Sequence, residues 1–330
     1  MRSTVTVLAL GGTIAMTATA QGEGAAPALD AAGLVATVPR LAEVADVRSE
    51  TVANVPSASV TVADVLAVLG RARRAARAGC AGVVVTHGTD TLEETAYLLD
   101  LLWDRPEPLV VTGAMRTPDQ PGADGPANLL AAAVTASSPS ARGLGAVVVL
   151  GDELHLARHV TKADAVALTP FRSPGWGPAG RVVEGRLRVA YRPARRFEPL
   201  ASPGPGPVRV PVVEAVLDDD ASTFRAVLTA GPPAVVLAAT GSGSVSVPVA
   251  EACSEARAAG TPVVLASRTG SGPLLERTYG YPGSARDLVA RGVLPAGSLT
   301  PRRARLLTHV LLAAGSPVTA LRDELAARGA

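Results

Sequence analysis

The chain contains a single lysine, Lys162, among 31 basic residues, so the other 30 are arginines. The two side chains differ in chemistry, because a lysine ammonium can give up its proton inside a protein and a guanidinium cannot. A position that keeps Lys in so arginine-rich a chain is therefore a candidate for proton transfer. The alternative is that the arginine bias left one lysine behind by chance.

A threonine and an aspartate at the start of a predicted helix are candidate partners for this lysine. In the run Thr-His-Gly-Thr-Asp-Thr-Leu-Glu-Glu, Thr91 and Glu94 predict a capping box that begins the helix. Thr89 and Asp90 then lie at the helix N-terminus, where the dipole favours an ionised carboxylate. They could be capping residues, but the box needs neither. Because a threonine hydroxyl requires a base to act as a nucleophile, these two residues and Lys162 form a candidate acyl-transfer set.

Two further polar clusters follow predicted strands. Gly11, Gly12 and Thr13 come directly after an apolar stretch, and the two glycines permit a sharp turn that exposes backbone amides. The alternatives are an ordinary turn or a weak phosphate loop, although the spacing of the known phosphate-binding motifs is absent. In the run Thr-Gly-Ala-Met-Arg, Ala114 could offer its carbonyl to a ligand or serve only in packing.

The elements that must position these residues alternate between apolar β-branched runs and Ala- and Leu-rich stretches. This pattern predicts an α/β fold with a mostly parallel sheet, in which ligands bind beyond the carboxyl ends of the strands. The expected elements are strands at 5–10, 82–86, 108–112 and 146–150, helices at 61–78, 91–102 and 124–135, and a β-hairpin at 181–191 that turns at Glu184 and Gly185.

A Pro- and Gly-rich segment, residues 199–209, predicts a linker between two α/β domains. The larger, N-terminal domain would span residues 1–198 and the smaller, C-terminal parallel-sheet domain residues 210–330. The expected elements after the break are strands at 208–216, 234–239 and 262–266, and helices at 220–229, 247–258, 285–291 and 300–314, followed by a polar end.

Charge and hydropathy bear on partners and location. The formal net charge is +2 and the arginines are scattered along the sequence, so neither a nucleic acid nor a membrane surface is an expected partner. No apolar run is long enough to span a bilayer, and the N-terminal apolar stretch is too short for a signal peptide. We therefore expect a cytoplasmic protein.

The cysteines and histidines do not have metal-ligand spacing. Cys80 and Cys253 are isolated, which predicts reduced, buried thiols. His155 and His159 are four residues apart, but only Asp152 or Glu153 could add a third ligand nearby. We expect neither a metal nor a cofactor.

Two separate motifs carry a resemblance to a known family. Gly-Gly-Thr-Ile-Ala at 11–15 and His-Gly-Thr-Asp-Thr at 87–91 resemble motifs of the bacterial L-asparaginase family, of the two-domain, Thr-nucleophile type. The likeness covers nearly the whole chain and is weaker after the linker. Its further matches are Asn54-Val55-Pro56-Ser57, residues 112–116, Asp124-Gly125-Pro126-Ala127-Asn128-Leu129, Thr161-Lys162, Gly241-Ser242-Gly243-Ser244 and residues 292–305.

The resemblance implies an amidohydrolase that releases ammonia from asparagine through an acyl-enzyme. Thr13 would be the primary nucleophile, and Thr89, Asp90 and Lys162 would form a second triad. The family is usually a tetramer built of close dimers, with each site between an N-terminal domain and a neighbour's C-terminal domain.

The resemblance also implies how a small amino-acid amide would be held. Asp90 would bind its α-amino group, Ser57 its α-carboxylate and the Ala114 carbonyl its leaving nitrogen, while backbone amides near Thr89 would stabilise the oxyanion. The implied substrate-binding residues are Gly12, Ser57, Gly88, Thr89, Asp90, Ala114 and Ser244.

The chain departs from the family at three places. The family has a Tyr on the loop after the nucleophile, but residues 16–28 contain none. Ala58 stands where the family has Gln or Glu, and Ser244 where an Asn often reaches the neighbouring site. The Ala- and Gly-rich stretch 18–28 is still expected to be a flexible lid. Candidate substitutes for the missing Tyr are Thr17, Thr19, Gln21 and Glu23.

Several functions stay open on the sequence. An asparaginase is the leading prediction, and a broader asparaginase/glutaminase or another small-amide hydrolase is a close variant. A catalytically impaired amino-acid-binding or regulatory protein on the same fold is an alternative of another class. A nucleotide-binding protein is a weaker option, because no phosphate-loop motif supports it.

Overall fold

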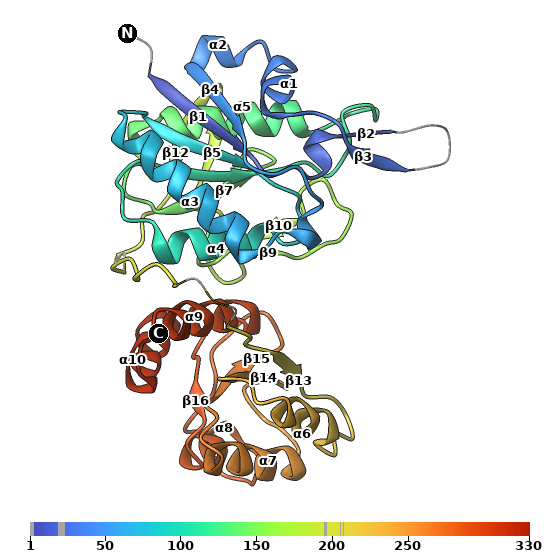
Figure 1. The fold of residues 1–330 in the computed structure, drawn as a ribbon, viewed down its shortest axis with the longest axis vertical. Coiled ribbons are helices and arrows are strands. Elements are labelled where there is room, and N and C mark those ends of the chain that lie inside the picture. The colour runs from blue at the N-terminus through green and yellow to red at the C-terminus, as the bar shows by residue number, and fades with distance from the viewer. Residues whose placement is uncertain (1–2, 19–23, 195–196, 205, 207) are drawn as a thin grey trace. The chain divides into compact units, whose positions relative to one another are not determined.

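The structure is a computed structural model that describes residues 3–18, 24–194, 197–204, 206 and 208–330. The chain forms two compact units, Met1–Pro199 and Leu200–Ala330, each with a sheet of its own (Figure 1).

The sheet of the N-terminal unit has the strand order β12-β11-β8-β7-β6-β5-β1-β4. The strands from β4 to β7 run parallel, whereas β8, β11 and β12 extend the sheet antiparallel. The bounds are β1 Thr4–Ala9, β4 Asp46–Thr51, β5 Gly82–Thr86, β6 Leu109–Thr112, β7 Ala146–Leu150, β8 Glu153–Leu156, β11 Gly180–Val183 and β12 Arg186–Val189.

Helices cover both faces of this sheet. α3 and α4 pack on one face, and α5 packs on the other against β5, β6 and β7 (Figure 1). The bounds are α1 Ala31–Ala36, α2 Leu41–Val44, α3 Val62–Arg77, α4 Leu92–Leu102 and α5 Gly125–Ser137, with short 3₁₀ helices η1 Thr13–Ala15, η2 Ser57–Ser59 and η3 Pro139–Ala141.

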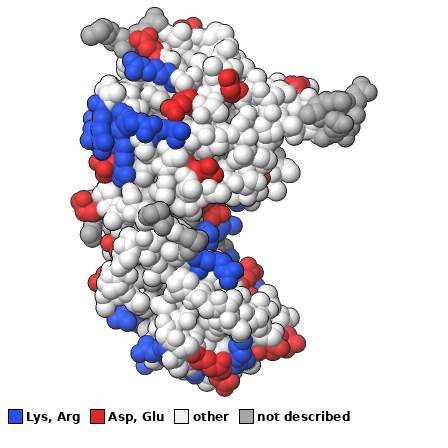
Figure 2. Space-filling model, viewed as in Figure 1, with Lys and Arg blue, Asp and Glu red and all other residues white. Residues whose placement is uncertain are grey.

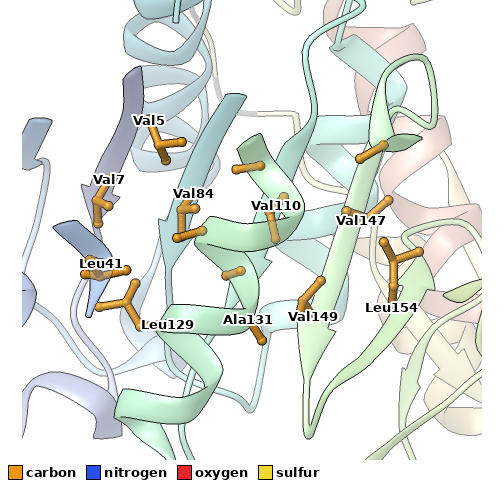
Figure 3. Packing of buried hydrophobic residues seen from close by; sticks show 14 of the residues in the cluster. Val5, Val7, Leu41, Val84, Val110, Leu129, Ala131, Val147, Val149 and Leu154 are labelled. Atoms are coloured by element: carbon orange, nitrogen blue, oxygen red, sulfur yellow. The ribbon is translucent and has the colours of Figure 1, made fainter. Parts of the chain in front are cut away.

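The core beneath α5 is built from one side of each parallel strand. Val5, Val84, Val110 and Val147 are fully buried and face Leu129 of α5 and its neighbours (Figure 3). The central strands β5, β6 and β7 are buried along their whole length, because they are covered on both faces. Burial on both sides explains why these strands are continuous apolar runs.

The predicted hairpin is present as β11 and β12. Glu184 and Gly185 at its turn have φ values of 51° and 69°, the left-handed conformation that a two-residue hairpin loop requires. Two smaller antiparallel pairs are β2 Met16–Ala18 with β3 Ala25–Pro27, and β9 Thr161–Lys162 with β10 Phe171–Arg172.

The C-terminal unit contains a parallel sheet in the order β13-β14-β15-β16. Its bounds are β13 Val212–Glu214, β14 Val235–Ala239, β15 Val263–Ser267, β16 Leu294–Pro295, α6 Ser222–Thr229, α7 Val247–Ala258, α8 Ala285–Ala290, α9 Pro301–Ala313 and α10 Val318–Gly329. The predicted mixed α/β class with a smaller second sheet is confirmed.

Two expectations for this unit are wrong. The first strand is shorter than 208–216, because Pro211 has no amide to donate to a ladder and the strand starts at Val212. The polar end is the helix α10, in which Leu321 and Leu325 are buried one turn apart while half of the other positions are polar.

Within the described residues, no helix is long and apolar enough to cross a membrane. Cys80 and Cys253 are buried and form no disulfide, as their isolation in the sequence predicts.

Candidate active site

The loops that follow β1, β5 and β6 meet at the carboxyl ends of these strands. The Leu10 amide donates a hydrogen bond to the Thr86 carbonyl at 3.0 Å, and the His87 amide donates to the Thr112 carbonyl at 2.9 Å. The three polar clusters found in the sequence therefore lie beside one another at one edge of the sheet.

Two of these loops approach so closely that only glycine fits. Gly12 has a φ of 89°, and a Cβ built on it would lie 2.2 Å from the Gly88 nitrogen. A Cβ on Gly88 would lie 2.8 Å from the Ser57 Oγ. Because neither contact leaves room for a side chain, these glycines bring the Thr13 loop, the Thr89 loop and Ser57 together.

Lys162 lies between Thr89 and Asp90. Its Nζ donates to the Thr89 Oγ1 at 3.0 Å and to the Asp90 Oδ1 at 2.6 Å. The lysine side chain is 14% exposed, whereas the Asp90 side chain is 70% exposed and open to a ligand. The structure thus joins the hydroxyl, the amine and the carboxylate into one cluster.

A second carboxylate fixes the backbone that carries this lysine. β9 contains only two residues, and Lys162 pairs with Phe171 of β10. The Lys162 amide also donates a hydrogen bond to the carboxylate of Glu93, a buried residue in the first turn of α4. The sequence assigned Glu93 no role, because its partner is a backbone amide, which every residue except proline offers.

Ser57 connects η2 to the start of α4. Its Oγ accepts a hydrogen bond from the Asp90 amide at 3.3 Å, and its carbonyl accepts one from the Thr91 hydroxyl at 2.8 Å. The predicted capping box is therefore wrong. Thr91 is the N-cap, but its side chain makes no capping bond because Ser57 takes its hydroxyl.

The Ala114 loop is fixed by two side chains of α5 and its cap. The Asp124 carboxylate accepts hydrogen bonds from the Met115 and Arg116 backbone amides, and the Asn128 side-chain Nδ2 donates to the Gly113 carbonyl at 3.0 Å. No described residue donates to the Ala114 carbonyl, and Ala114 itself is fully buried.

The remaining candidate residues do not belong to the hydrogen-bonded cluster around Lys162. The Thr13 hydroxyl forms no hydrogen bond with any residue that the structure describes. Ser244 belongs to the C-terminal unit, where its Oγ lies 2.8 Å from the Tyr281 hydroxyl. Of the possible substitutes for the missing Tyr, Thr17 lies in β2, whereas Thr19, Gln21 and Glu23, within the expected lid, fall outside the described residues.

His87 has a structural role beneath this site. Its Nδ1 lies 2.6 Å from the Gly88 carbonyl oxygen and its Nε2 lies 2.9 Å from the Thr95 Oγ1. Burial lowers the pKa of this histidine, so the imidazole is neutral near neutral pH. It supports the loop that carries Thr89 without reaching the cluster.

The histidines considered as metal ligands have other partners. The His155 Nδ1 lies 3.0 Å from the Ser173 Oγ and its Nε2 lies 3.4 Å from Glu153, while His159 stacks on Trp176. Among the described residues, no group of three or more His, Cys, Asp or Glu side chains could hold a metal ion.

The fold and the site together define a class of protein. It is a two-unit α/β protein in which hydroxyl, amine and carboxylate groups meet at the carboxyl ends of parallel strands, and these are the residue types of acyl transfer. Residues 4–195 match the protein-family model described as Asparaginase, N-terminal, and residues 209–324 match the Glutaminase/Asparaginase C-terminal domain. The chain therefore belongs to the asparaginase family.

Individual relatives agree with this assignment. The glutaminase-asparaginase of Pseudomonas fluorescens biotype A is 36% identical over 93% of this chain and 86% of its own length. A probable L-asparaginase of Deinococcus radiodurans is 37% identical over 93% and 92%. The crystal structure of a probable cytoplasmic L-asparaginase from Campylobacter jejuni superposes with a TM-score of 0.86 at 28% identity, covering 98% of this chain and 99% of that one.

Proposed function

We propose that this protein hydrolyses L-asparagine to L-aspartate and ammonia through an acyl-enzyme on Thr13. The observation that carries the proposal is the contact of Lys162 with both Thr89 and Asp90, at 3.0 and 2.6 Å. A general base must lie within hydrogen-bond reach of the hydroxyl that it deprotonates, and the lysine meets this condition for Thr89.

The proposed reaction has two halves. The Thr13 Oγ forms a bond to the side-chain amide carbon of the substrate, the carbon–nitrogen bond breaks, and ammonia leaves with a proton supplied by the site. Water then attacks the acyl ester and releases aspartate and the free hydroxyl. In the first half, Lys162 accepts the proton of the Thr13 hydroxyl through Thr89 and the leaving nitrogen receives it. In the second half, the proton of the attacking water takes the same route and returns to the Thr13 Oγ. Backbone amides at Gly88 and Thr89 stabilise the oxyanion in both halves.

The proposed binding groups surround this centre. The exposed Asp90 carboxylate binds the α-amino group, the Ser57 hydroxyl binds the α-carboxylate, and the Ala114 carbonyl, to which no described residue donates, accepts from the leaving nitrogen. Gly12 contributes backbone only, because nothing larger fits against Gly88. No metal or cofactor takes part in this proposal.

L-Glutamine is the second candidate substrate. Ala58, an exposed residue of η2, has no polar group to offer where the family carries Gln or Glu. The family's residue at this position contacts the substrate amino group, so Ala58 weakens a contact that asparagine and glutamine share, and one relative is named a glutaminase-asparaginase. The proposal therefore includes glutamine as a slower substrate.

Ammonia release by the purified protein tests the proposed function. We expect turnover of L-Asn, slower turnover of L-Gln and less of D-Asn, because D-Asn cannot place both α-groups on Asp90 and Ser57 at once. Faster turnover of L-Gln than of L-Asn would reverse the preference. If no amide released ammonia while L-Asp still bound, the chain would instead be an amino-acid-binding protein.

Glu93 supplies a prediction about positioning. Glu93→Ala should lower kcat for L-Asn by roughly 10²-fold, because an error of about 1 Å in placing a catalytic group costs that much. Glu93→Gln should restore most of the activity, since its amide oxygen can still accept from the Lys162 backbone. KM should change little in both variants. Equal losses for Ala and Gln would mean that the negative charge matters and the hydrogen bond does not.

Assembly, location and domain limits complete the proposal. We infer a homotetramer of close dimers in the cytoplasm, supported by the family membership and by a solved relative described as cytoplasmic. Within each chain the proposed catalytic domain is residues 1–198, followed by a linker at 199–209 and a second domain at 210–330.

A further inference from the structure

Arginines that are scattered along the sequence gather around one cavity of the N-terminal unit. Arg48 of β4 and Arg71 and Arg74 of α3 line a cavity of about 280 Å³. Figure 2 shows basic side chains collected over the C-terminal half of α3. This surface plays no part in the proposed amide hydrolysis.

On the side that faces this cavity, strand β1 carries two threonines, Thr4 and Thr6. Val5 and Val7 face the core under α5, so the alternate residues Thr4 and Thr6 face the opposite side, toward α3. Strands covered by helices on both faces are normally apolar on both. Here two hydroxyl side chains replace apolar ones, and Arg48 lies beside Thr6 in the register with β4.

Helix α3 forms one wall of the cavity, and small side chains on this wall leave space inside the cavity. Arg71, Arg74, Ala75 and Ala78 line the cavity, and their spacing of three, four and seven residues places them on one side of a helix. The two alanines are too short to fill the space between helix and sheet. These small residues on the same side of the helix as the two arginines therefore leave room for a ligand beside the guanidinium groups.

The charges in the cavity are unbalanced. Arg71 pairs with Glu50 at 2.6 Å, but Arg48 and Arg74 form no ion pair with any acidic residue that the structure describes. Three guanidinium groups against one carboxylate leave an excess of two positive charges. Cys80 also lines the cavity and does not offset them, because burial raises the pKa of its thiol and keeps it neutral.

The excess positive charge and the hydroxyl groups of Thr4 and Thr6 indicate which class of ligand the cavity can bind. Guanidinium groups bind oxyanions through paired hydrogen bonds, and a threonine hydroxyl can donate one more. A carboxylate would neutralise one charge, whereas a phosphate monoester carries between about 1.5 and 2 negative charges at pH 7. We propose that this cavity binds the phosphate group of a small molecule, either free phosphate or a compact phosphate monoester.

The proposed site is separate from the candidate active site. Thr4 and Thr6 lie in the first half of β1, while the Gly-Gly-Thr loop follows the other end of the same strand. A bound phosphate would not meet the substrate, so this proposal does not rest on the amidohydrolase function.

Isothermal titration of the full-length protein with inorganic phosphate and with glycerol 3-phosphate tests the proposal, at constant ionic strength because exposed charges are screened by salt. We expect saturable binding of at least one of them, and the tighter one identifies the source. The double variant Arg48→Gln, Arg74→Gln should weaken binding by about tenfold or more. Arg77→Gln is the matched control, because Arg77 lies on α3 outside the cavity and has no described acidic partner.

A variant that is expected to bind phosphate more tightly is a further test, because a misfolded protein could lose binding but could not gain it. Glu50→Gln should tighten phosphate binding by roughly fivefold, because it removes a negative charge from the cavity and releases Arg71. Absence of saturable binding by either phosphate compound would overturn the proposal. So would an equal loss for Arg77→Gln and the double variant, or binding of a DNA duplex without binding of either small phosphate.

Discussion

Thr13→Ala is expected to lower kcat for L-asparagine by roughly 10⁴-fold or more, the largest loss among these variants. The substitution removes the oxygen that forms the acyl-enzyme, and no neighbouring group can replace that bond. Its stability should stay within about 0.5 kcal/mol of the parent, because the Thr13 hydroxyl has no hydrogen bond to a described residue. Ammonia release and thermal unfolding, measured on the same preparation, separate these two effects.

Thr13→Ser is the control for this experiment. It keeps the hydroxyl and removes one methyl group, so kcat should remain within about tenfold of the parent. Mass spectrometry of a rapidly quenched reaction should find the acyl group on the peptide that contains Thr13. An acyl group on the Thr89 peptide, together with activity in Thr13→Ala, would exchange the roles of the two threonines.

The fold was predictable where the pattern of apolar residues is local. The central strands β5, β6 and β7 are continuous apolar runs because both faces are buried, and their limits differ from the expected ones by no more than one residue. The mostly exposed strand β4 and the two-residue strand β16 have no such run, and the sequence did not predict them. Gly185, preceded by Glu184, also marked the hairpin turn. By contrast, α10 was read as a polar end because its packing rests on Leu321 and Leu325, too few apolar positions to stand out.

The candidate site was predictable in its residue types more than in its geometry. Thr89 and Asp90 are adjacent in the sequence, but Lys162 follows more than 70 residues later on a strand of two residues. Such a strand has no periodicity to detect, and its place depends on pairing with Phe171 and on the hydrogen bond that the Lys162 backbone amide donates to the Glu93 carboxylate. Contacts of this kind become visible only in three dimensions.

The arginines illustrate the same limit. Spacing along the chain suggested scattered charges without a stripe, yet Arg48 on β4 and Arg74 on α3 line one cavity. A helix crossing over a sheet brings together residues that no sequence window contains. Charge clustering is therefore a property of the fold, and only the net charge can be taken from the composition.

Lys162→Arg is the second decisive variant, with kcat expected to fall by roughly 10²- to 10⁴-fold, the scale of losing a general base. Arginine keeps the positive charge and can still pair with Asp90, but it cannot release a proton to become a base. KM should change much less than kcat, because the charge beside Asp90 remains. Steady-state kinetics between pH 6 and about 10 should show the loss at every pH.

The control for this exchange is Arg172→Lys. Arg172 lies on β10, the partner strand of β9, and its guanidinium donates to the Thr169 and Phe171 carbonyls outside the cluster. Parent-like kcat in this variant would show that the hairpin tolerates a change between the two basic side chains. Primary amines added to Lys162→Ala should restore part of the activity, since they supply the missing proton acceptor. Parent-like turnover by Lys162→Arg would instead show that the lysine is only a counter-ion of Asp90. Its presence as the single lysine of an arginine-rich chain would then be a matter of chance.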